Sequence, residues 1–126
     1  MYSHNMVGSN DIDASKKFYD ATFQAIGGKP GIQDDKGRLI YMHNGGLFLV
    51  TAPIDGQPAT AGNGCTIGFA MENPEQANAW HAAGVEAGGT SIEDPPGVRV
   101  GGVGQLYLAY LRDPSGNKLC ALHRVA

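Results

Sequence analysis

Cysteines and long hydrophobic runs are both scarce in this sequence, and each scarcity excludes a class of protein. Cys65 and Cys120 have neither the number nor the spacing of a disulfide framework or a zinc motif, so we expect two reduced thiols. No apolar run reaches the roughly 20 residues that a membrane helix needs, and residues 1–11 lack the basic-then-apolar order of a signal peptide. The sequence therefore predicts a cytoplasmic protein that does not associate with membranes.

The chain also carries little net charge. The formal net charge is only −3, and no block of like charges interrupts the chain. Proteins that bind nucleic acid or an anionic membrane surface need clustered Lys and Arg side chains, so we expect neither partner. The sequence also has no His-Glu-x-x-His motif, no dinucleotide-binding fingerprint and no recognisable Ser-His-Asp set.

Glycine is what the sequence has in abundance, with 19 among 126 residues. That frequency is typical of a sheet protein with many tight turns rather than of a helical bundle. A chain of this length can bury roughly two-thirds of its unfolded surface in one core without disulfides or metals. We therefore expect a single domain.

The first half of the chain predicts one strand, one helix and three further strands. Apolar side chains recur at helical spacing after Asn10 and Asp11, either of which can cap the helix, and Gly27-Gly28 ends it. The expected elements are a strand over Ser3–Val7, a helix over Asn10–Ile26, and strands over Lys29–Asp34, Arg38–His43 and Leu47–Thr51.

The second half predicts the same order after a Pro- and Gly-rich connection. This linker covers about residues 53–63, between a first module of about 1–52 and a second of about 64–126. Asn73 and Pro74 form a helix start, with Asn as the cap and Pro at the first helical position. The remaining segments are a strand over Cys65–Met71, a short strand over Thr90–Glu93, a glycine-rich mobile loop over Pro95–Gly104 and a hairpin over Tyr107–Arg124.

The hairpin is the most informative stretch. Its turn, Asp113-Pro114-Ser115-Gly116-Asn117, has the residues of a type I turn followed by a position with positive φ. If Arg112 pairs with Lys118, then Tyr110 lies opposite Cys120 on one face of the sheet. The two halves also match as a repeat, with Phe18 corresponding to Trp80, Tyr41 to Tyr110 and Phe48 to Cys120.

This order of elements, the opening SHNMVGSNDIDASKKFYD and the segment YLAYLRDPSGNKLCALHR resemble the vicinal oxygen chelate superfamily. That superfamily includes glyoxalase I, extradiol dioxygenases, fosfomycin-resistance enzymes and bleomycin-binding proteins. The resemblance implies an α+β fold in which two β-α-β-β-β modules form a cup-shaped mixed sheet with the helices outside. It also implies a homodimer and a small-molecule ligand held in the cup.

The resemblance further implies a divalent-metal site with ligands on four strands. Carried over to this sequence, those ligand positions fall on His4, Phe48, Thr66 and Cys120. Only His4 matches the ligand type of the family, Phe48 cannot bind a metal, and a Cys120 thiolate suits Zn²⁺ better than the harder ions. The sequence therefore disfavours the standard metal as a cofactor.

The same positions supply the candidate site residues. His4, Cys120 and Tyr110 are candidates for catalysis, in which a His4 imidazolium would stabilise a Cys120 thiolate. The structural alternatives are a strand-end histidine, a packed thiol and a core tyrosine. The candidates for substrate binding are Phe48, Thr66, Tyr41 and Arg99.

Three functions follow from these candidates. The first is a glyoxalase-like protein that acts on or binds a small organic molecule in the cup without the standard metal. The second is a protein that sequesters its ligand without turnover, as bleomycin-resistance proteins do. The third is a metal-dependent lyase or dioxygenase that uses His4 and Cys120.

Overall fold

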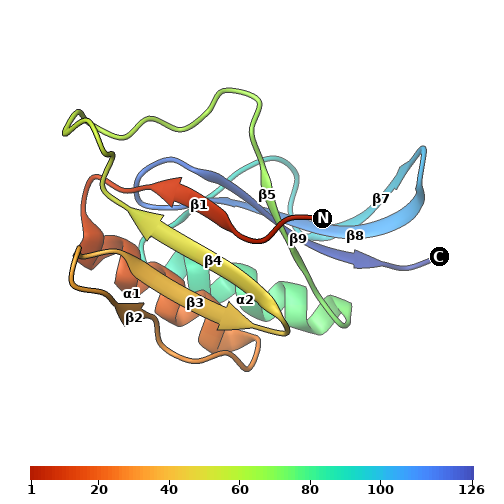
Figure 1. The fold of residues 1–126 in the computed structure, drawn as a ribbon. Helices are drawn as coiled ribbons and strands as arrows, with labels where there is room; N and C mark the ends of the chain where they lie inside the picture. Colours follow the sequence, from red (N-terminus) through yellow and green to blue (C-terminus); the bar gives the residue numbers. More distant parts are fainter.

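The computed structural model describes residues 1–126 and contains two helices and nine strands (Figure 1). No helix combines the length and the apolar character that crossing a membrane requires. The first module consists of β1 (Asn5–Gly8), α1 (Ile12–Ala25), β2 (Ile32–Gln33), β3 (Leu39–His43) and β4 (Gly46–Thr51). The second consists of β5 (Ile67–Ala70), α2 (Pro74–Glu86), β6 (Thr90–Ser91), β7 (Gly97–Gly101), β8 (Gly104–Arg112) and β9 (Lys118–Arg124).

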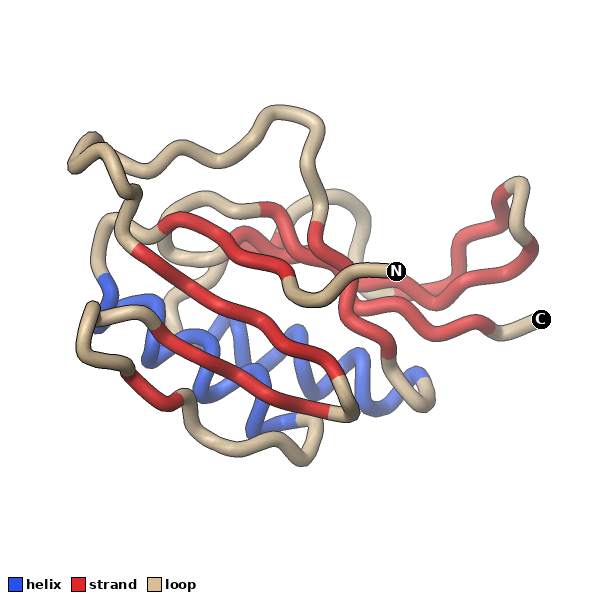
Figure 2. Tube along the Cα trace, viewed as in Figure 1, coloured by secondary structure: helices blue, strands red, loops and turns tan.

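Each module builds its own mixed sheet. The strand order is β1-β4-β3-β2 in the first and β5-β9-β8-β6 in the second, where β7 also pairs with β8. The first and last strands of each module, β1 with β4 and β5 with β9, pair in parallel. Both helices lie on the same side of the strands (Figure 2). The predicted α+β fold of two β-α-β-β-β modules is therefore confirmed, with one strand more in the second module.

Local sequence signals determine where the helices begin. The Asp11 carboxylate accepts a hydrogen bond from the Ala14 amide at 3.0 Å, and the Asn73 side chain accepts one from the Gln76 amide at 2.7 Å. The Gln76 side chain in turn accepts from the Glu72 amide at 2.8 Å, which completes a reciprocal cap. Both predicted caps are confirmed.

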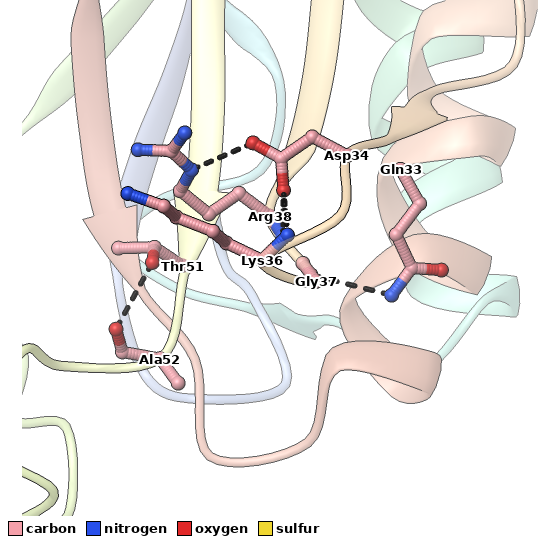
Figure 3. Close-up of polar contacts among 7 residues, drawn as sticks. All are labelled: Gln33, Asp34, Lys36, Gly37, Arg38, Thr51 and Ala52. Atoms are coloured by element: carbon pink, nitrogen blue, oxygen red, sulfur yellow. Dashed lines mark hydrogen bonds and ion pairs between the residues drawn. The ribbon is translucent and has the colours of Figure 1, made fainter.

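A similar device orders the turn between β2 and β3 (Figure 3). One oxygen of the Asp34 carboxylate accepts from the backbone amides of Lys36 and Arg38, and the other accepts from Arg38 Nε at 2.7 Å. The Gln33 side chain donates to the Gly37 carbonyl at 3.2 Å. Side chains on both sides of the predicted turn over residues 35–37 thus stabilise it. These bonds hold the short strand β2 against β3.

The hairpin of β8 and β9 has the predicted register. Arg112 pairs with Lys118, and Tyr110 pairs with Cys120. The Asp113 carbonyl accepts from the Gly116 amide at 2.9 Å, and Gly116 has a φ of 92°, a region that glycine enters at little cost. The turn chemistry therefore fixes which side chains share a face.

The segment predicted as a mobile loop is a strand. β7 pairs with β8 along its whole length, so the second module has one strand more than the first. Val98 and Val100 alternate with smaller or polar residues, a pattern that favours a strand although three glycines surround it. In Figure 1 this hairpin extends past the end of α2. The prediction of a mobile loop over Pro95–Gly104 is wrong because backbone pairing with β8 orders the glycines.

Side chains alternate between two faces along each strand. One face packs on the helices and includes fully buried residues such as Leu39, Val50, Leu111 and Leu119. We call the opposite face, away from the helices, the cup face. Its residues come from β1, β3, β4, β5, β8 and β9: Met6, Ile40, Met42, Leu47, Leu49, Gly68, Leu108, Tyr110, Cys120 and Leu122.

These registers correct the match between the modules. Tyr41 pairs with Phe48 on the helix-facing side, whereas Tyr110 pairs with Cys120 on the cup face. The predicted matches of Tyr41 with Tyr110 and Phe48 with Cys120 are therefore wrong. The residue of β4 that corresponds to Cys120 is Leu49, because a shift of one residue moves every side chain of a strand to the other face.

The core is continuous across the two modules. α1 and α2 cross closely at Gly84, where an added Cβ would meet Phe18 and Thr22 at 3.2 Å. The Trp80 side chain, 2% exposed, lies on the same helix, and its ring centroid is 6.2 Å from that of Phe69 in β5. Large aromatic side chains thus join each helix to its sheet and the helices to each other.

A buried polar network also joins the modules. The Asp113 carboxylate, in the turn between β8 and β9, accepts from the Tyr19 hydroxyl of α1 at 2.6 Å. It also accepts from the Asn117 side chain at 2.9 Å, and that side chain donates its other hydrogen to the Gly8 carbonyl at the end of β1 at 2.8 Å. The last turn of the second module is therefore bonded to both elements that open the first.

Candidate functional site

Polar and charged side chains gather on the cup face around Cys120. The Lys118 ammonium lies 4.9 Å from the centre of the Tyr110 ring and forms an ion pair with Glu93. The Arg99 side chain shares the face of Leu106 and Leu108 through the pairing of β7 with β8. We call these five residues the Cys120 cluster: Glu93, Arg99, Tyr110, Lys118 and Cys120.

Arg99 is the cation of this cluster that no carboxylate neutralises. Its guanidinium donates to the carbonyl of Gly97 at 3.0 Å and to that of Asp94 at 2.9 Å. These neutral acceptors fix the side chain in place but leave its charge uncompensated. The charge also lies close enough to Cys120 to favour the thiolate, so it acts directly on the cluster.

The two central groups of the cluster are both protonated at neutral pH. Burial raises the pKa of the Cys120 thiol, although the Tyr110 hydroxyl opposes this shift. Burial, together with the nearby Cys120 sulfur, also raises the pKa of Tyr110. At neutral pH the cluster therefore presents a phenol that can donate a hydrogen bond and a thiol that donates to the Ala121 carbonyl at 3.5 Å, and it does not hold a preformed thiolate nucleophile.

This electrostatic arrangement predicts the pH dependence of Cys120 alkylation. In a Cys65→Ser background, the iodoacetamide reaction is expected to increase with pH about a midpoint above the roughly 8.5 of an ordinary thiol. Because the Glu93 carboxylate raises the pKa of Cys120, Glu93→Gln is expected to shift that midpoint downward. The measurement is the alkylation rate followed by mass spectrometry between pH 6 and about pH 10, the range that spans both states of the thiol.

The matched control is Asp94→Asn, which removes the neighbouring carboxylate that does not affect Cys120 and should leave the midpoint unchanged. A midpoint at or below that of an ordinary thiol would contradict this account of the cluster.

His4 lies apart from the cluster. It precedes β1, is exposed, and its one polar contact joins Nδ1 to the Ser3 hydroxyl at 2.8 Å. No hydrogen bond or ion pair connects it with Cys120, so the structure does not assemble the predicted imidazolium–thiolate pair. Thr66 lies just before β5 and lines a shallow depression together with Met6 and Lys118, at the approach of β1 to β5.

Tyr41 and Phe48, both predicted to bind substrate, lie on the helix-facing side. The Tyr41 hydroxyl donates to Asp20 at 2.7 Å, and burial followed by this bond raises its pKa. Phe48 packs against Tyr19 and Phe69 at centroid distances of 4.9 and 5.3 Å. Both line a cleft of about 260 Å³ between the modules.

The ligand positions implied by the family resemblance do not fit a divalent metal. They carry His4, Thr66, Cys120 and, after the register correction, Leu49 in place of Phe48. Across the chain, no three His, Cys, Asp or Glu side chains lie close enough together to hold a metal ion. These four positions therefore offer one imidazole, one hydroxyl and one thiol, and no carboxylate.

Sequence reasoning missed Glu93 and Lys118. Lys118 could have been found, since the predicted pairing with Arg112 places it next to the strand positions of Tyr110 and Cys120. Glu93 had no such signal. It lies between β6 and β7 with a φ of 59°, an uncommon conformation for a residue with a Cβ, and only the fold brings its carboxylate to Lys118.

The chain matches a family profile and is similar to solved structures. The profile of the Glyoxalase/Bleomycin resistance protein/Dioxygenase superfamily matches residues 2–121. A crystal structure of a glyoxalase/bleomycin resistance protein from Albidiferax ferrireducens T118 is 59% identical, with a TM-score of 0.94 over 98% of this chain and 99% of that one. No curated protein matches the sequence.

More distant solved structures share the fold. A glyoxalase/bleomycin resistance protein/dioxygenase family enzyme from Burkholderia phytofirmans PsJN is 19% identical, with a TM-score of 0.73 over 98% of each chain. A glyoxalase-related enzyme from Fulvimarina pelagi is 17% identical, with a TM-score of 0.70 over 98% of this chain and 88% of that one. At these identities the similarity shows a shared fold, namely the arrangement of the two modules.

Proposed function

Because this chain belongs to the glyoxalase/bleomycin resistance protein/dioxygenase superfamily, we propose that it binds a small organic anion on its cup face without the metal site of that family. The observation that carries the proposal is the uncompensated charge of Arg99 beside Tyr110 and Cys120. A carboxylate or similar anionic group would neutralise that guanidinium and accept charge-assisted hydrogen bonds from it.

The apolar part of the ligand has a surface to occupy. Leu108 and Leu122 pair directly across β8 and β9 on the cup face, next to the pair of Tyr110 and Cys120. Leu122 is half-buried whereas Leu108 is 8% exposed, so binding there would remove mainly Leu122 area from water, and the Tyr110 hydroxyl offers a polar contact. The ligand class that fits is therefore amphipathic, with an anionic group at Arg99 and an apolar body over β8 and β9.

Binding without turnover is favoured over catalysis by the protonation of the cluster. A general base must be deprotonated near neutral pH, and both Tyr110 and Cys120 have raised pKa values. The remaining candidate base, His4, has its polar contact with Ser3 and none with the cluster. The groups present suit recognition of a ligand better than proton abstraction from it.

The test compares phenylacetate with its neutral counterpart phenethyl alcohol in a binding titration. The intact protein is expected to bind phenylacetate, and Arg99→Gln is expected to weaken that binding about tenfold, the size of one lost charge-assisted hydrogen bond. Arg38→Gln is the matched control, because Arg38 pairs with Asp34 in the turn of the other module. Equal affinity for the acid and the alcohol, or equal loss in both variants, would refute an anion site at Arg99.

A further inference from the structure

Two cations and one carboxylate surround Cys120. The Glu93 carboxylate forms an ion pair with the Lys118 ammonium, whereas the Arg99 guanidinium bonds only backbone carbonyls. The charges of all three side chains act on Cys120, so they lie close enough to act together on a ligand held beside it. Since Tyr110 and Cys120 are protonated at neutral pH, the Cys120 cluster carries one net positive charge.

The other cation of this hairpin is bonded to the turn. Arg112 pairs with Lys118 across β8 and β9, but its guanidinium donates to the Gly116 carbonyl at 2.7 Å. Arg112 is also not among the charges that act on Tyr110 or Cys120. A second negative charge on a ligand would therefore find no further free cation in the cluster.

Glu93 is held in place by the backbone around it. The Ile92 amide donates to the Tyr110 carbonyl at 3.4 Å, which ties the residue before Glu93 to β8. Glu93 itself has a φ of 59°, a left-handed conformation that costs free energy for a residue with a Cβ. Its carboxylate pairs with Lys118 and, unlike that of Asp34, accepts no backbone amide of its own turn. The carboxylate therefore acts on Lys118 and does not shape the turn.

Lys118 would be a second anion-binding group without that partner. Its ammonium lies 4.9 Å from the centre of the Tyr110 ring, at the place where the Arg99 charge also acts. An ammonium with no counter-charge would bond a ligand anion there, as the Arg99 guanidinium does. Glu93 thus removes one of two cations from the site.

From these observations we propose that Glu93 determines the specificity of the cup face, because by neutralising Lys118 it limits the ligand to a single negative charge. This inference rests on the anion site proposed at Arg99 and names its ligand class, which is monocarboxylates in preference to dicarboxylates. The first carboxylate binds Arg99. A second would lose hydration and approach Glu93 without a free cation to meet it.

The test compares phenylacetate with phenylmalonate, which carries a second carboxylate on the same carbon. The intact protein is expected to bind phenylmalonate no more tightly than phenylacetate. Glu93→Gln leaves Lys118 without a counter-charge, so it should strengthen phenylacetate binding about threefold and phenylmalonate binding about tenfold, since the energy of an ion in a field is proportional to its charge. These factors are modest because Glu93 and Lys118 are 44% and 28% exposed and water screens them.

Two controls separate charge from structure. Glu93→Gln combined with Lys118→Gln returns the cluster to one positive charge, so it should restore the ligand preference of the intact protein. Asp94→Asn removes a neighbouring exposed carboxylate while Arg99 keeps its bond to the Asp94 carbonyl, so both affinities should stay unchanged. Thermal unfolding of each variant shows that it is folded. A purely structural ion pair would change the unfolding temperature but not the ratio of the two affinities.

Binding titrations at about pH 7.5 and about 50 mM salt measure both affinities, since the carboxylates are ionised there and screening is moderate. The proposal is overturned if Glu93→Gln changes both affinities by the same factor or changes neither. It is also overturned if the intact protein binds phenylmalonate about tenfold more tightly than phenylacetate. In each of these cases phenylacetate still binds, so the anion site at Arg99 stands. If the intact protein binds neither ligand, the anion site itself is refuted, and the limit to one charge is refuted with it.

Discussion

Replacing Asp113 by alanine is expected to lower the free energy of unfolding by about 3 to 5 kcal/mol, one of the two largest effects of a single substitution in this chain. The carboxylate is 3% exposed and has no cation among its partners. Four donors compensate its burial: the Tyr19 hydroxyl, the Asn117 side chain, and the backbone amides of Ser115 and Asn117.

The loss of stability arises from the groups that have no partner once the carboxylate is removed. Without the carboxylate, the Tyr19 hydroxyl is a buried donor with no acceptor, and the turn loses the bonds that shape it. Tyr19→Phe removes one of the four donors and keeps the others, so its cost should be smaller, about 1 to 2 kcal/mol. The difference between the two variants separates the tie to α1 from the stability of the turn itself.

The measurement is urea denaturation followed by circular dichroism, with the slope of the transition checked for constancy. Asp55→Ala is the matched control, because that carboxylate also accepts from a backbone amide two residues on, at 3.0 Å, but in an exposed turn. Its cost should stay below about 1 kcal/mol. A loss for Asp113→Ala no larger than for Asp55→Ala would show that the buried network adds nothing to stability.

Replacing Trp80 by alanine is expected to cost about 3 to 5 kcal/mol as well, for a different reason. The indole fills the space between α2 and the second sheet, is 2% exposed, and contacts Phe69. Since close packing of Gly84 on Leu111 of β8 fixes the distance between α2 and the second sheet, α2 cannot move inward to fill the space that the indole leaves. The cavity therefore remains, and the lost contacts are not recovered.

Val85→Ala serves as the control for Trp80→Ala. Val85 is on the same helix but 45% exposed, so its truncation removes apolar atoms without opening a cavity, and the expected cost is below about 1 kcal/mol. Both variants are compared by urea denaturation. If Trp80→Ala costs as little as Val85→Ala, the core around α2 can adjust more than the Gly84 contact implies.

The parts of the fold that could be predicted are those with a local cause. Asp11 and Asn73 cap their helices through bonds to residues three positions on, and the Asp113 turn sets the register of β8 and β9 by itself. β7 was missed because its identity depends on pairing with β8, while its own glycines resemble a loop. Strand pairing is a non-local property that composition alone does not show.

The same distinction holds for the site. Tyr110 and Cys120 lie together because one hairpin carries both. Tyr41 and Phe48 were matched to them across the repeat, where nothing local fixes the register, and an error of one residue moved both to the wrong face. The pairing of Lys118 with Glu93 joins a strand to an irregular segment, so it could be found only in the folded chain.

The bonds from the last turn to β1 and α1 also bear on the order of events during synthesis. Residues 1–51 leave the ribosome first, yet the Gly8 carbonyl and the Tyr19 hydroxyl bond residues 117 and 113. Until that turn has emerged, the nascent first module must keep its opening strand and helix partly solvated, with apolar surface exposed. The module that is made first is thus completed last, so translation that stops before residue 113 should yield an aggregation-prone chain instead of an independently folded half.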